Sequence, residues 1–346
     1  MMTDFIGKWY VPAEQVVLWL ATFLCALLAT RLVLAFAPRL QLLDRPSFRS
    51  SHTETTPRGG GLAIVIAFFL ALLALYLGRY LKGRLAEALT FGGAIAVVGF
   101  LDDRKSLPAT ARLIVQVVAA VMAVTLIGVR SHLIGGGGAL GDCSIRILAV
   151  LAIVWATNLF NFMDGIDGIA AVQAIFMAAG AATFNAYLGG DSGLTAAMWT
   201  LTAASAGFLV WNWSPARIFM GDVGSGFLGF TLAIFFLSMS RDHAIAVEIS
   251  LILSGTFVVD ATVTLIRRVV RGDRWFDAHR MHAYQHLARH WRSHRAVTLS
   301  IAAIDVGWLL PWAWATAIRP ADAALFVVLA LLPLVILATF VGAGAP

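Results

Sequence analysis

Apolar stretches of about twenty residues, the length that an α-helix needs to cross a bilayer, recur along the whole chain. We expect helices at about 16–37, 61–78, 86–101, 111–129, 145–160, 168–187, 193–211, 225–240, 244–266, 296–316 and 321–341. The sequence therefore predicts an all-α polytopic integral membrane protein with about eleven transmembrane helices, ten being the alternative count.

The composition agrees with this interpretation. Hydrophobic residues make up 60% of the chain and charged residues only 13%, whereas soluble domains carry roughly 25% charged residues. Because the helices leave little chain for a soluble domain, we expect residues 1–346 to form a single transmembrane domain. The first apolar stretch lacks a small-residue cleavage site, which favours a membrane anchor over a removed signal peptide.

The basic residues predict an orientation. If the N-terminus lies outside and the helices alternate, 16 of the 25 lysines and arginines fall on the inner side and 8 on the outer side. This bias favours a periplasmic N-terminus and a cytoplasmic C-terminus in a bacterial inner membrane. The net charge of +6 then reflects topology and contact with anionic lipid, and not nucleic-acid binding. Two cysteines, Cys25 and Cys143, indicate neither a disulfide framework nor a metal knuckle.

In this orientation, all the segments rich in Asp, Asn, His and Gly lie on the inner face. These segments are 42–61, 100–107, 158–168, 219–226 and 267–290, whereas the outer loops 135–138 and 187–193 resemble plain turns. Ionisable groups at a membrane boundary favour a functional interpretation over one of solvated loops. The sequence therefore predicts a site on the cytoplasmic face.

Two adjacent acids, Asp102 and Asp103, fall at the predicted C-terminal end of a helix, where the helix dipole disfavours negative charge. A metal ion, the basic residues Arg104 and Lys105, or a shared proton could compensate them. The alternative is a solvated helix end without a function.

Two further inner segments offer oxygen ligands. Asn161, Asp164 and Asp167 follow one another at intervals of three, where the chain turns into the next helix, and could bind a cation or a nucleobase; a capping cluster is the alternative. Asp222 lies among small residues that would let the backbone approach a ligand, and it suits a hard cation, although a helix N-cap looks the same.

The loop at about 267–295 is rich in Arg and His. His279, Arg280 and His282 are candidate donors to phosphate oxygens, as is Arg58 in the segment TTPRGGG. An amphipathic interfacial helix is the alternative for His286, His290 and His294, and a zinc site is disfavoured because no cysteine joins the histidines.

Cation ligands and phosphate donors beside lipid predict phosphoryl transfer between a soluble donor and a membrane-embedded acceptor. The alternative from another class is a magnesium-coupled transporter, which would place its polar residues near the middle of the membrane. Only Asp260 and Asp305 fall there, so we favour the enzyme.

The inner motifs together resemble those of the polyprenyl-phosphate N-acetylhexosamine-1-phosphate transferases (glycosyltransferase family 4). They are D-R-P-x-x-R…H-x-x-x-x-P-R-x-G-G at 44–60, L-D-D at 101–103, N-x-x-N-x-x-D-G-I-D-G at 158–168, G-D-x-G-S at 221–225 and the closing histidine loop. The sequence AHRMHAYQHLAR at 278–289 is similar to the branch that initiates O-antigen synthesis. The D-G-x-x-A-R signature of the CDP-alcohol phosphatidyltransferases is missing.

This resemblance implies transfer of N-acetylhexosamine-1-phosphate from a UDP-sugar to undecaprenyl phosphate, giving the diphospholipid and UMP, with Mg²⁺ or Mn²⁺. It implies Asn161 and Asp222 as metal ligands and Asp102 and Asp103 as the catalytic acids at the lipid phosphate. It places Asp167 and Phe219 at the uracil and His279, Arg280 and His282 at the pyrophosphate, with Arg58 and Asp164 also at the substrates. Another envelope pathway (enterobacterial common antigen, teichoic acid or peptidoglycan lipid I) is the alternative, and the sequence leaves the donor sugar and a homodimer open.

Overall fold

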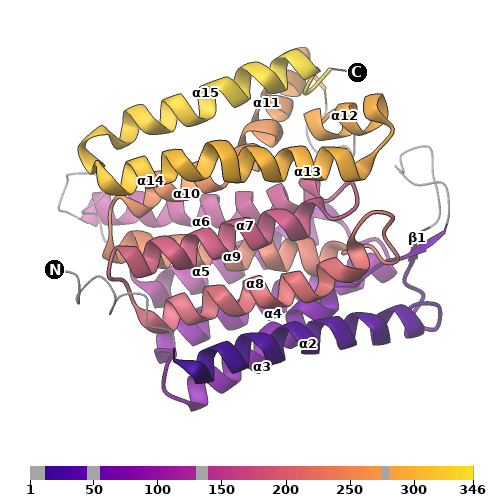
Figure 1. The fold of residues 1–346 in the computed structure, drawn as a ribbon, viewed down its shortest axis with the longest axis horizontal. Helices are drawn as coiled ribbons and strands as arrows, with labels where there is room; N and C mark the ends of the chain where they lie inside the picture. Colours follow the sequence, from indigo (N-terminus) through magenta and orange to yellow (C-terminus); the bar gives the residue numbers. More distant parts are fainter. Residues whose placement is uncertain (1–11, 45–54, 130–138, 274–279, 346) are drawn as a thin grey trace.

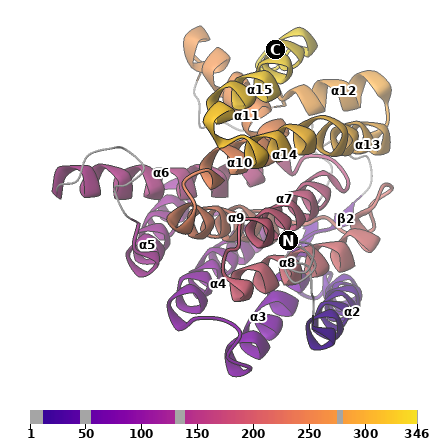
Figure 2. The same cartoon turned by 60° about the vertical axis from the view of Figure 1, so that its left-hand side comes forward.

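A bundle of long, roughly antiparallel helices forms the protein (Figures 1 and 2), as seen in a computed structural model that describes residues 12–44, 55–129, 139–273 and 280–345. The helices are α2 (Ala13–Phe36), α3 (Gly61–Leu77), α4 (Gly83–Arg104), α5 (Ala109–Ile127), α6 (Ala139–Met163), α7 (Ile169–Tyr187), α8 (Ser192–Asn212), α9 (Asp222–Asp242), α10 (Ala246–Leu253), α11 (Gly255–Arg271), α12 (Ala283–Trp291), α13 (His294–Ile304), α14 (Leu310–Ile318) and α15 (Ala323–Val341). A π-helical turn, η2 (Asp305–Leu309), joins α13 to α14, and a 3-10 turn, η3 (Pro320–Asp322), precedes α15.

The described residues contain nine helices long and apolar enough to cross a membrane, and a tenth span if α10 and α11 are taken together. These two helices meet at a bend of 73°. The apolar helix α3 has 17 residues and would make an eleventh. The prediction of an all-α polytopic membrane protein is confirmed, and the predicted number of spans is met when the bent pair and α3 are both counted.

The central helix of the bundle is α9, which is almost entirely buried and contacts α3, α4 and α6. Glycines permit these contacts: a Cβ on Gly229 would lie 2.3 Å from the carbonyl oxygen of Ala156, and one on Gly224 would lie 2.6 Å from the Cα of Gly61. The small residues after Asp222 therefore allow helices to pack closely, and the approach of a ligand to Asp222 stays a prediction.

Little extended structure accompanies the helices among the described residues. The strands β1 (Leu43–Asp44) and β2 (Thr56–Pro57) pair antiparallel, with Leu43 opposite Pro57. The backbone of Phe219 extends this pairing, because its N–H donates to the carbonyl of Pro57 at 2.8 Å and its carbonyl accepts from the N–H of Gly60 at 2.9 Å. This ties the segment before α9 to the segment before α3.

Candidate active site

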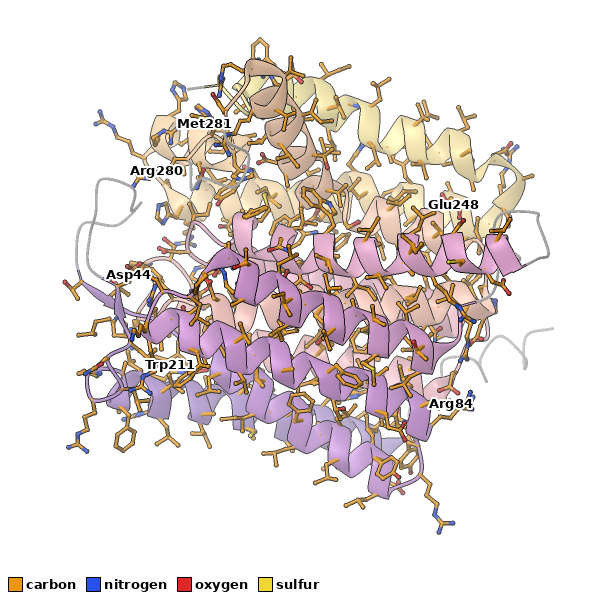
Figure 3. All side chains as sticks on the ribbon, turned by 180° about the vertical axis from the view of Figure 1, so that it is seen from behind. Asp44, Arg84, Trp211, Glu248, Arg280 and Met281 are labelled. Carbon is orange, nitrogen blue, oxygen red and sulfur yellow. The ribbon has the colours of Figure 1, made fainter. Side chains whose placement is uncertain are left out.

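The described parts of the predicted inner segments gather at one end of the bundle. Seen from behind, Asp44, Arg280 and Met281 lie at one end, and Arg84 and Glu248 lie at the other (Figure 3). Helices α4, α6 and α8 end here, and α5, α7 and α9 begin here, so short turns bring their polar termini together. The chemically rich motifs therefore share one face although they are distant in sequence.

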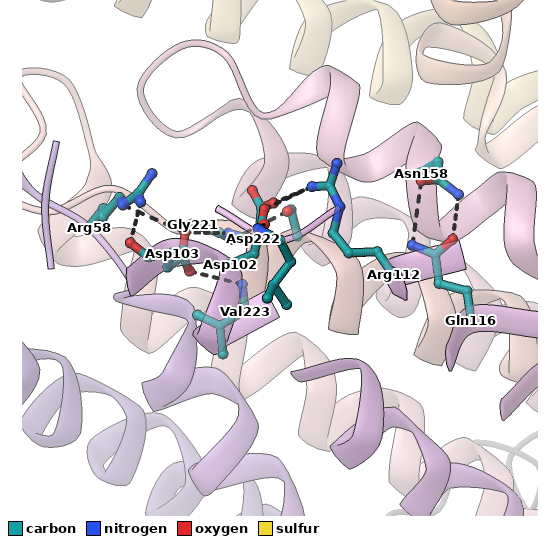
Figure 4. Close-up of polar contacts among 11 residues, drawn as sticks. Arg58, Asp102, Asp103, Arg112, Gln116, Asn158, Gly221, Asp222 and Val223 are labelled. Atoms are coloured by element: carbon teal, nitrogen blue, oxygen red, sulfur yellow. Dashed lines mark hydrogen bonds and ion pairs between the residues drawn. The ribbon is translucent and has the colours of Figure 1, made fainter. Parts of the chain in front are cut away.

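Asp103 caps a helix that follows it by more than a hundred residues. Its Oδ1 accepts the backbone N–H of Asp222 at 3.0 Å, and its Oδ2 accepts that of Val223 at 3.1 Å (Figure 4). These N–H groups lie in the first turn of α9 and have no partner within the helix. The helix dipole favours a negative charge at this position. The side chain of Asp103 is 1% exposed. The N-terminus of α9 thus compensates the negative charge of Asp103, which the sequence places unfavourably at the end of a helix.

Arg58 lies against the same carboxylate. Its Nη2 donates to the backbone carbonyl of Asp103, and its Nε lies 3.8 Å from Oδ1 of Asp103. The Arg58 side chain is still 32% exposed, so part of its guanidinium faces solvent at the membrane boundary. Its predicted role as a phosphate donor stays a prediction, and the structure adds that it neutralises the buried Asp103.

Arg112, on α5, was missed by the sequence analysis and bridges two of the predicted acids. One of its nitrogens, Nη1, donates to Oδ2 of Asp102 at 2.8 Å and to Oδ2 of Asp222 at 3.1 Å (Figure 4). The other oxygen of Asp102 accepts the N–H of Leu107 at 2.6 Å. In sequence Arg112 stands four residues past Pro108 at the start of an apolar helix, a position that carries no motif.

Asn161 and Asp164 complete the acidic cluster. The Asn161 side chain hydrogen-bonds the carboxylate of Asp222. Asp164, in the turn after α6, has a pKa well above its ordinary value because it is desolvated and because Asp222, Asp103 and Asp167 add negative charge around it. The structure therefore brings the acids of three separate motifs into one cluster.

A divalent cation fits the chemistry of this cluster. Carboxylate and amide oxygens are the ligands that Mg²⁺ prefers, and Mg²⁺ commonly takes only one or two carboxylates plus substrate phosphates. Positive charge near Asp164 would also offset the negative charge of its neighbours, which adds to desolvation in raising its pKa. No group of three or more His, Cys, Asp or Glu side chains arranged to enclose a metal occurs among the described residues.

A narrow cavity leads from this cluster between α4, α5, α6 and α9. Its lining includes Arg112, Asn161 and Asp222 at one end, and Gln116 and Asn158 further along. The amides of Gln116 and Asn158 hydrogen-bond each other at 2.7 and 3.4 Å (Figure 4). Asn158 of the 158–168 motif therefore provides the hydrogen-bond partner for the side-chain amide of Gln116 on α5.

Asp167 lies at the edge of the cluster and is well anchored. Its Oδ2 accepts the N–H of Ala216 at 3.2 Å, and its Oδ1 lies 3.3 Å from Nδ1 of His294. Burial raises the pKa of Asp167, but the hydrogen bond and charge of His294, helped by Ala216 and Ser214, outweigh it and hold the pKa below its ordinary value. Its predicted contact with uracil stays a prediction, as does that of Phe219.

The predicted phosphate-binding residues of the histidine loop separate in the structure. His282 is buried, its Nδ1 lies 3.2 Å from Oδ1 of Asp260, and the same carboxylate accepts the N–H groups of Ala283 and Tyr284 at 2.9 and 3.0 Å. Asp260, which a transporter would use within the membrane, instead caps α12. His279 lies outside the described residues.

Arg280 instead lines a basic hollow between α12, the start of α13 and the turn at Ser214. The volume of this hollow is about 530 Å³, and its walls include Arg289, Arg292 and His294. Arg292 ends α12 with φ of +52°, a left-handed conformation that favours glycine, so an arginine there carries a backbone cost. The structure thus adds Arg289 and Arg292 to the candidate anion-binding residues.

Comparisons with known proteins identify the family of the chain. The model of "Glycosyl transferase family 4" matches residues 85–240. The chain is 32% identical over 293 residues to the "Probable undecaprenyl-phosphate N-acetylglucosaminyl 1-phosphate transferase" of Bacillus subtilis (strain 168), covering 83% of this chain and 80% of that protein. The chain belongs to glycosyl transferase family 4. It is therefore an enzyme of the transferase class.

Two further relatives of this family 4 member align with similar shares of the chain. The "Decaprenyl-phosphate N-acetylglucosaminephosphotransferase" of Mycobacterium tuberculosis (strain ATCC 25618 / H37Rv) is 33% identical over 84% of this chain and 80% of its own. The "Undecaprenyl-phosphate alpha-N-acetylglucosaminyl 1-phosphate transferase" of Salmonella typhi is 27% identical over 80% and 76%. The family match at 85–240 includes Asp102, Asp103, Asn161 and Asp222, but ends before the histidine loop.

Proposed function

We propose that the enzyme transfers N-acetylhexosamine-1-phosphate from a UDP-sugar to undecaprenyl phosphate, giving undecaprenyl-diphospho-sugar and UMP. In this reaction, an oxygen of the lipid phosphate forms a bond to the sugar-linked phosphorus. The bond from that phosphorus to the bridging oxygen breaks, and UMP leaves with the electron pair. The observation that carries the proposal is the cluster of Asp102, Asp103, Asp164 and Asp222 with Arg58 and Arg112 at the end of a membrane bundle. The names of the three relatives support the same class of reaction.

Asp222 and Asn161 would hold Mg²⁺, with Asp164 beside them. Bound there, the cation would neutralise the donor diphosphate and polarise its phosphoryl oxygens. Mn²⁺, another oxygen-preferring ion, is an alternative.

The residues of the chain bind and orient the two phosphates. Arg112, held between Asp102 and Asp222, and Arg58, beside Asp103, supply positive charge to the lipid phosphate at the bilayer surface. A phosphomonoester has a second pKa of about 6, so it needs little deprotonation near neutral pH. We therefore assign Asp102 to positioning Arg112 and the acceptor, and not to general-base catalysis.

On the donor side, we place the uracil near Asp167 and Phe219 and the diphosphate toward Arg280. Because the segment 278–289 resembles the branch that initiates O-antigen synthesis, we propose a donor of that type: UDP-N-acetylglucosamine or a 6-deoxy N-acetylhexosamine such as N-acetylfucosamine or N-acetylquinovosamine. Because the donor is cytoplasmic, the proposal requires the site to face the cytoplasm of a bacterial inner membrane.

A radiolabel assay tests the proposal directly. Purified protein, undecaprenyl phosphate and a panel of UDP-sugars should give a labelled lipid product with at least one N-acetylhexosamine donor and release UMP. A protein that labels no lipid with any UDP-N-acetylhexosamine would contradict the proposed function.

The same assay tests the metal site. Chelation with EDTA should abolish turnover and Mg²⁺ or Mn²⁺ should restore it, because Asp222 and Asn161 provide oxygens for a hard cation. Asp222→Ala should lose turnover by two orders of magnitude or more, in keeping with about 10²-fold or greater costs of removing one electrostatic group from such sites. Asp142→Ala, at the opposite end of α6, is the control. Full activity in EDTA would refute the metal assignment.

A further inference from the structure

The residues that follow α15 fold back onto α11 and the loop before α12. The Nη1 of Arg267 donates to the carbonyl of Ala343 at 2.8 Å, and the Nη1 of Arg271 donates to the carbonyl of Gly344 at 2.7 Å. Ala343 is fully buried. We call residues 343–345 the clasp. Two charged donors therefore fix its backbone, and such hydrogen bonds are stronger than neutral ones.

The clasp has no room for a side chain at Gly344. A Cβ there would lie 2.9 Å from the Cβ of Arg267 and 3.0 Å from the carbonyl oxygen of Thr264, and the φ of Gly344 is +75°. The space therefore excludes a side chain, and the positive φ favours glycine. A larger residue would move the clasp away from α11.

On its other side, the clasp holds the loop that leads into α12. The N–H of Gly344 donates to the carbonyl of Met281 at 2.6 Å, and the backbone of Ala345 hydrogen-bonds His286. Met281 lies between Arg280, which lines the basic hollow, and His282, which is bound to Asp260. The clasp thus contacts the loop one residue from a candidate donor-binding side chain.

The start of α12 is in turn connected to the acidic cluster. The hydroxyl of Tyr284 donates to the carbonyl of Phe162 at 3.0 Å, and it lies against Gly165, where a Cβ would come within 2.1 Å of the Tyr284 oxygen. Gly165 directly follows Asp164. A displacement of Met281 would therefore also move the turn that contains Asp164.

We propose that the clasp positions Arg280 and the start of α12 for binding of the nucleotide-sugar donor, and that Gly344 is its positioning residue. This inference rests on the proposed function, because it places the donor at this loop. None of the hydrogen bonds found for the clasp among the described residues involves Arg58 or Arg112, on the acceptor side of the site.

The test compares Gly344→Asn with Gly342→Asn. Asn tolerates positive φ better than other side chains, so both variants keep that conformation accessible. Gly342 has φ of +98°, but the nearest atom to its added Cβ is the Cβ of Ala345 at 3.9 Å, so only Gly344→Asn meets a blocked position. We expect Gly344→Asn to raise KM for the UDP-sugar about tenfold, equivalent to roughly 1.4 kcal/mol. KM for undecaprenyl phosphate should stay within about twofold, and Gly342→Asn should resemble the wild type in both constants.

A second readout needs no substrate. Amide hydrogen exchange of residues 281–286 should be faster in Gly344→Asn, and in Arg271→Gln, than in the wild type or Gly342→Asn. Equal increases in both KM values, or unchanged exchange at 281–286, would overturn the proposal. If the wild type uses no UDP-sugar, the proposed function fails, and hydrogen exchange alone decides whether the clasp holds the loop.

Discussion

At the scale of single residues, Asp102 and Asp103 are neighbours with different tasks. Asp103 is buried and accepts two N–H groups at the start of α9, whereas Asp102 holds Arg112 at the edge of the cluster. The sequence treats them as a pair, because the cap of Asp103 lies 119 residues away in the chain. Only the packing of α4 against α9 shows which of the two acids caps α9.

This difference predicts the effects of two matched substitutions. Asp103→Ala leaves two buried N–H groups without a partner and should lower the free energy of unfolding by about 1–3 kcal/mol. Asp102→Ala should unfold close to the wild type but lose turnover, because Arg112 is released from one partner. Thermal unfolding in detergent and turnover of the two variants check this. Equal unfolding temperatures of Asp103→Ala and Asp102→Ala would contradict the role of Asp103 as the cap of α9.

The pairing of Asp167 with His294 predicts a pH dependence. Because the pKa of Asp167 is lower in the folded protein than in the unfolded chain, its ionisation stabilises the fold above the unfolded value, near 3.9. This contribution is lost as the pH falls through the folded value. Asp167→Asn should therefore unfold at a lower temperature than the wild type near pH 7, and the difference should shrink below about pH 4. Asp142→Asn is the control, and a difference that persists unchanged in acid would contradict this assignment.

At the scale of elements, hydropathy predicts the helices closely. The stretches expected at 61–78, 168–187 and 193–211 are observed as Gly61–Leu77, Ile169–Tyr187 and Ser192–Asn212. Each stretch is a nearly continuous run of apolar residues whose ends are marked by polar or glycine residues, so its bounds are visible in the sequence.

The stretch expected at 244–266 is different, because the structure bends it by 73° between α10 and α11. The bend falls at Ser254 and Gly255, and a Cβ on Gly255 would lie 2.7 Å from Leu331. Leu331 lies on α15, far from Gly255 in sequence, so the residues around 254–255 alone do not predict the bend. Arg112 was missed for the same reason, because its importance arises only from its partners on α4 and α9.

The element α12 predicts where donor selectivity is located. His282, Ala283 and Tyr284 are buried at its start, whereas Arg289 and Arg292 face the basic hollow at its end. Arg289→Gln and Arg292→Gln should each change kcat/KM for different UDP-sugars by different factors, because a site that hydrogen-bonds a sugar group discriminates against analogues lacking it. Arg295→Gln, outside the lining of the hollow, is the control. Identical losses for every donor would mean that the two arginines bind only the diphosphate.

At the scale of the whole molecule, the site depends on alternation of the spans. Because consecutive helices run in alternating directions, every second connection between them lies at the same end of the bundle. The motifs at 102–103, 158–168 and 219–222 lie in or beside three such connections and therefore meet, although no two are adjacent in sequence. The sequence could predict that they share a face, from charge and spacing alone. It could not predict their contacts, because these depend on glycines that let α9 approach α3, α4 and α6.

The orientation of the whole bundle can be tested with a cysteine that the chain already has. Cys143, at the start of α6, is exposed and lies at the end opposite the acidic cluster, so the proposed orientation places it outside. A membrane-impermeant thiol reagent should label it in intact cells. In a Cys143→Ser background, Ser192→Cys at the start of α8 should be labelled, and Ser106→Cys, beside Asp102 and Asp103, should be labelled only after the cells are opened. Ser106 and Ser192 are both exposed, so the two positions differ in side and not in burial. Labelling of Ser106→Cys in intact cells would place the acidic cluster outside and remove its access to a cytoplasmic UDP-sugar.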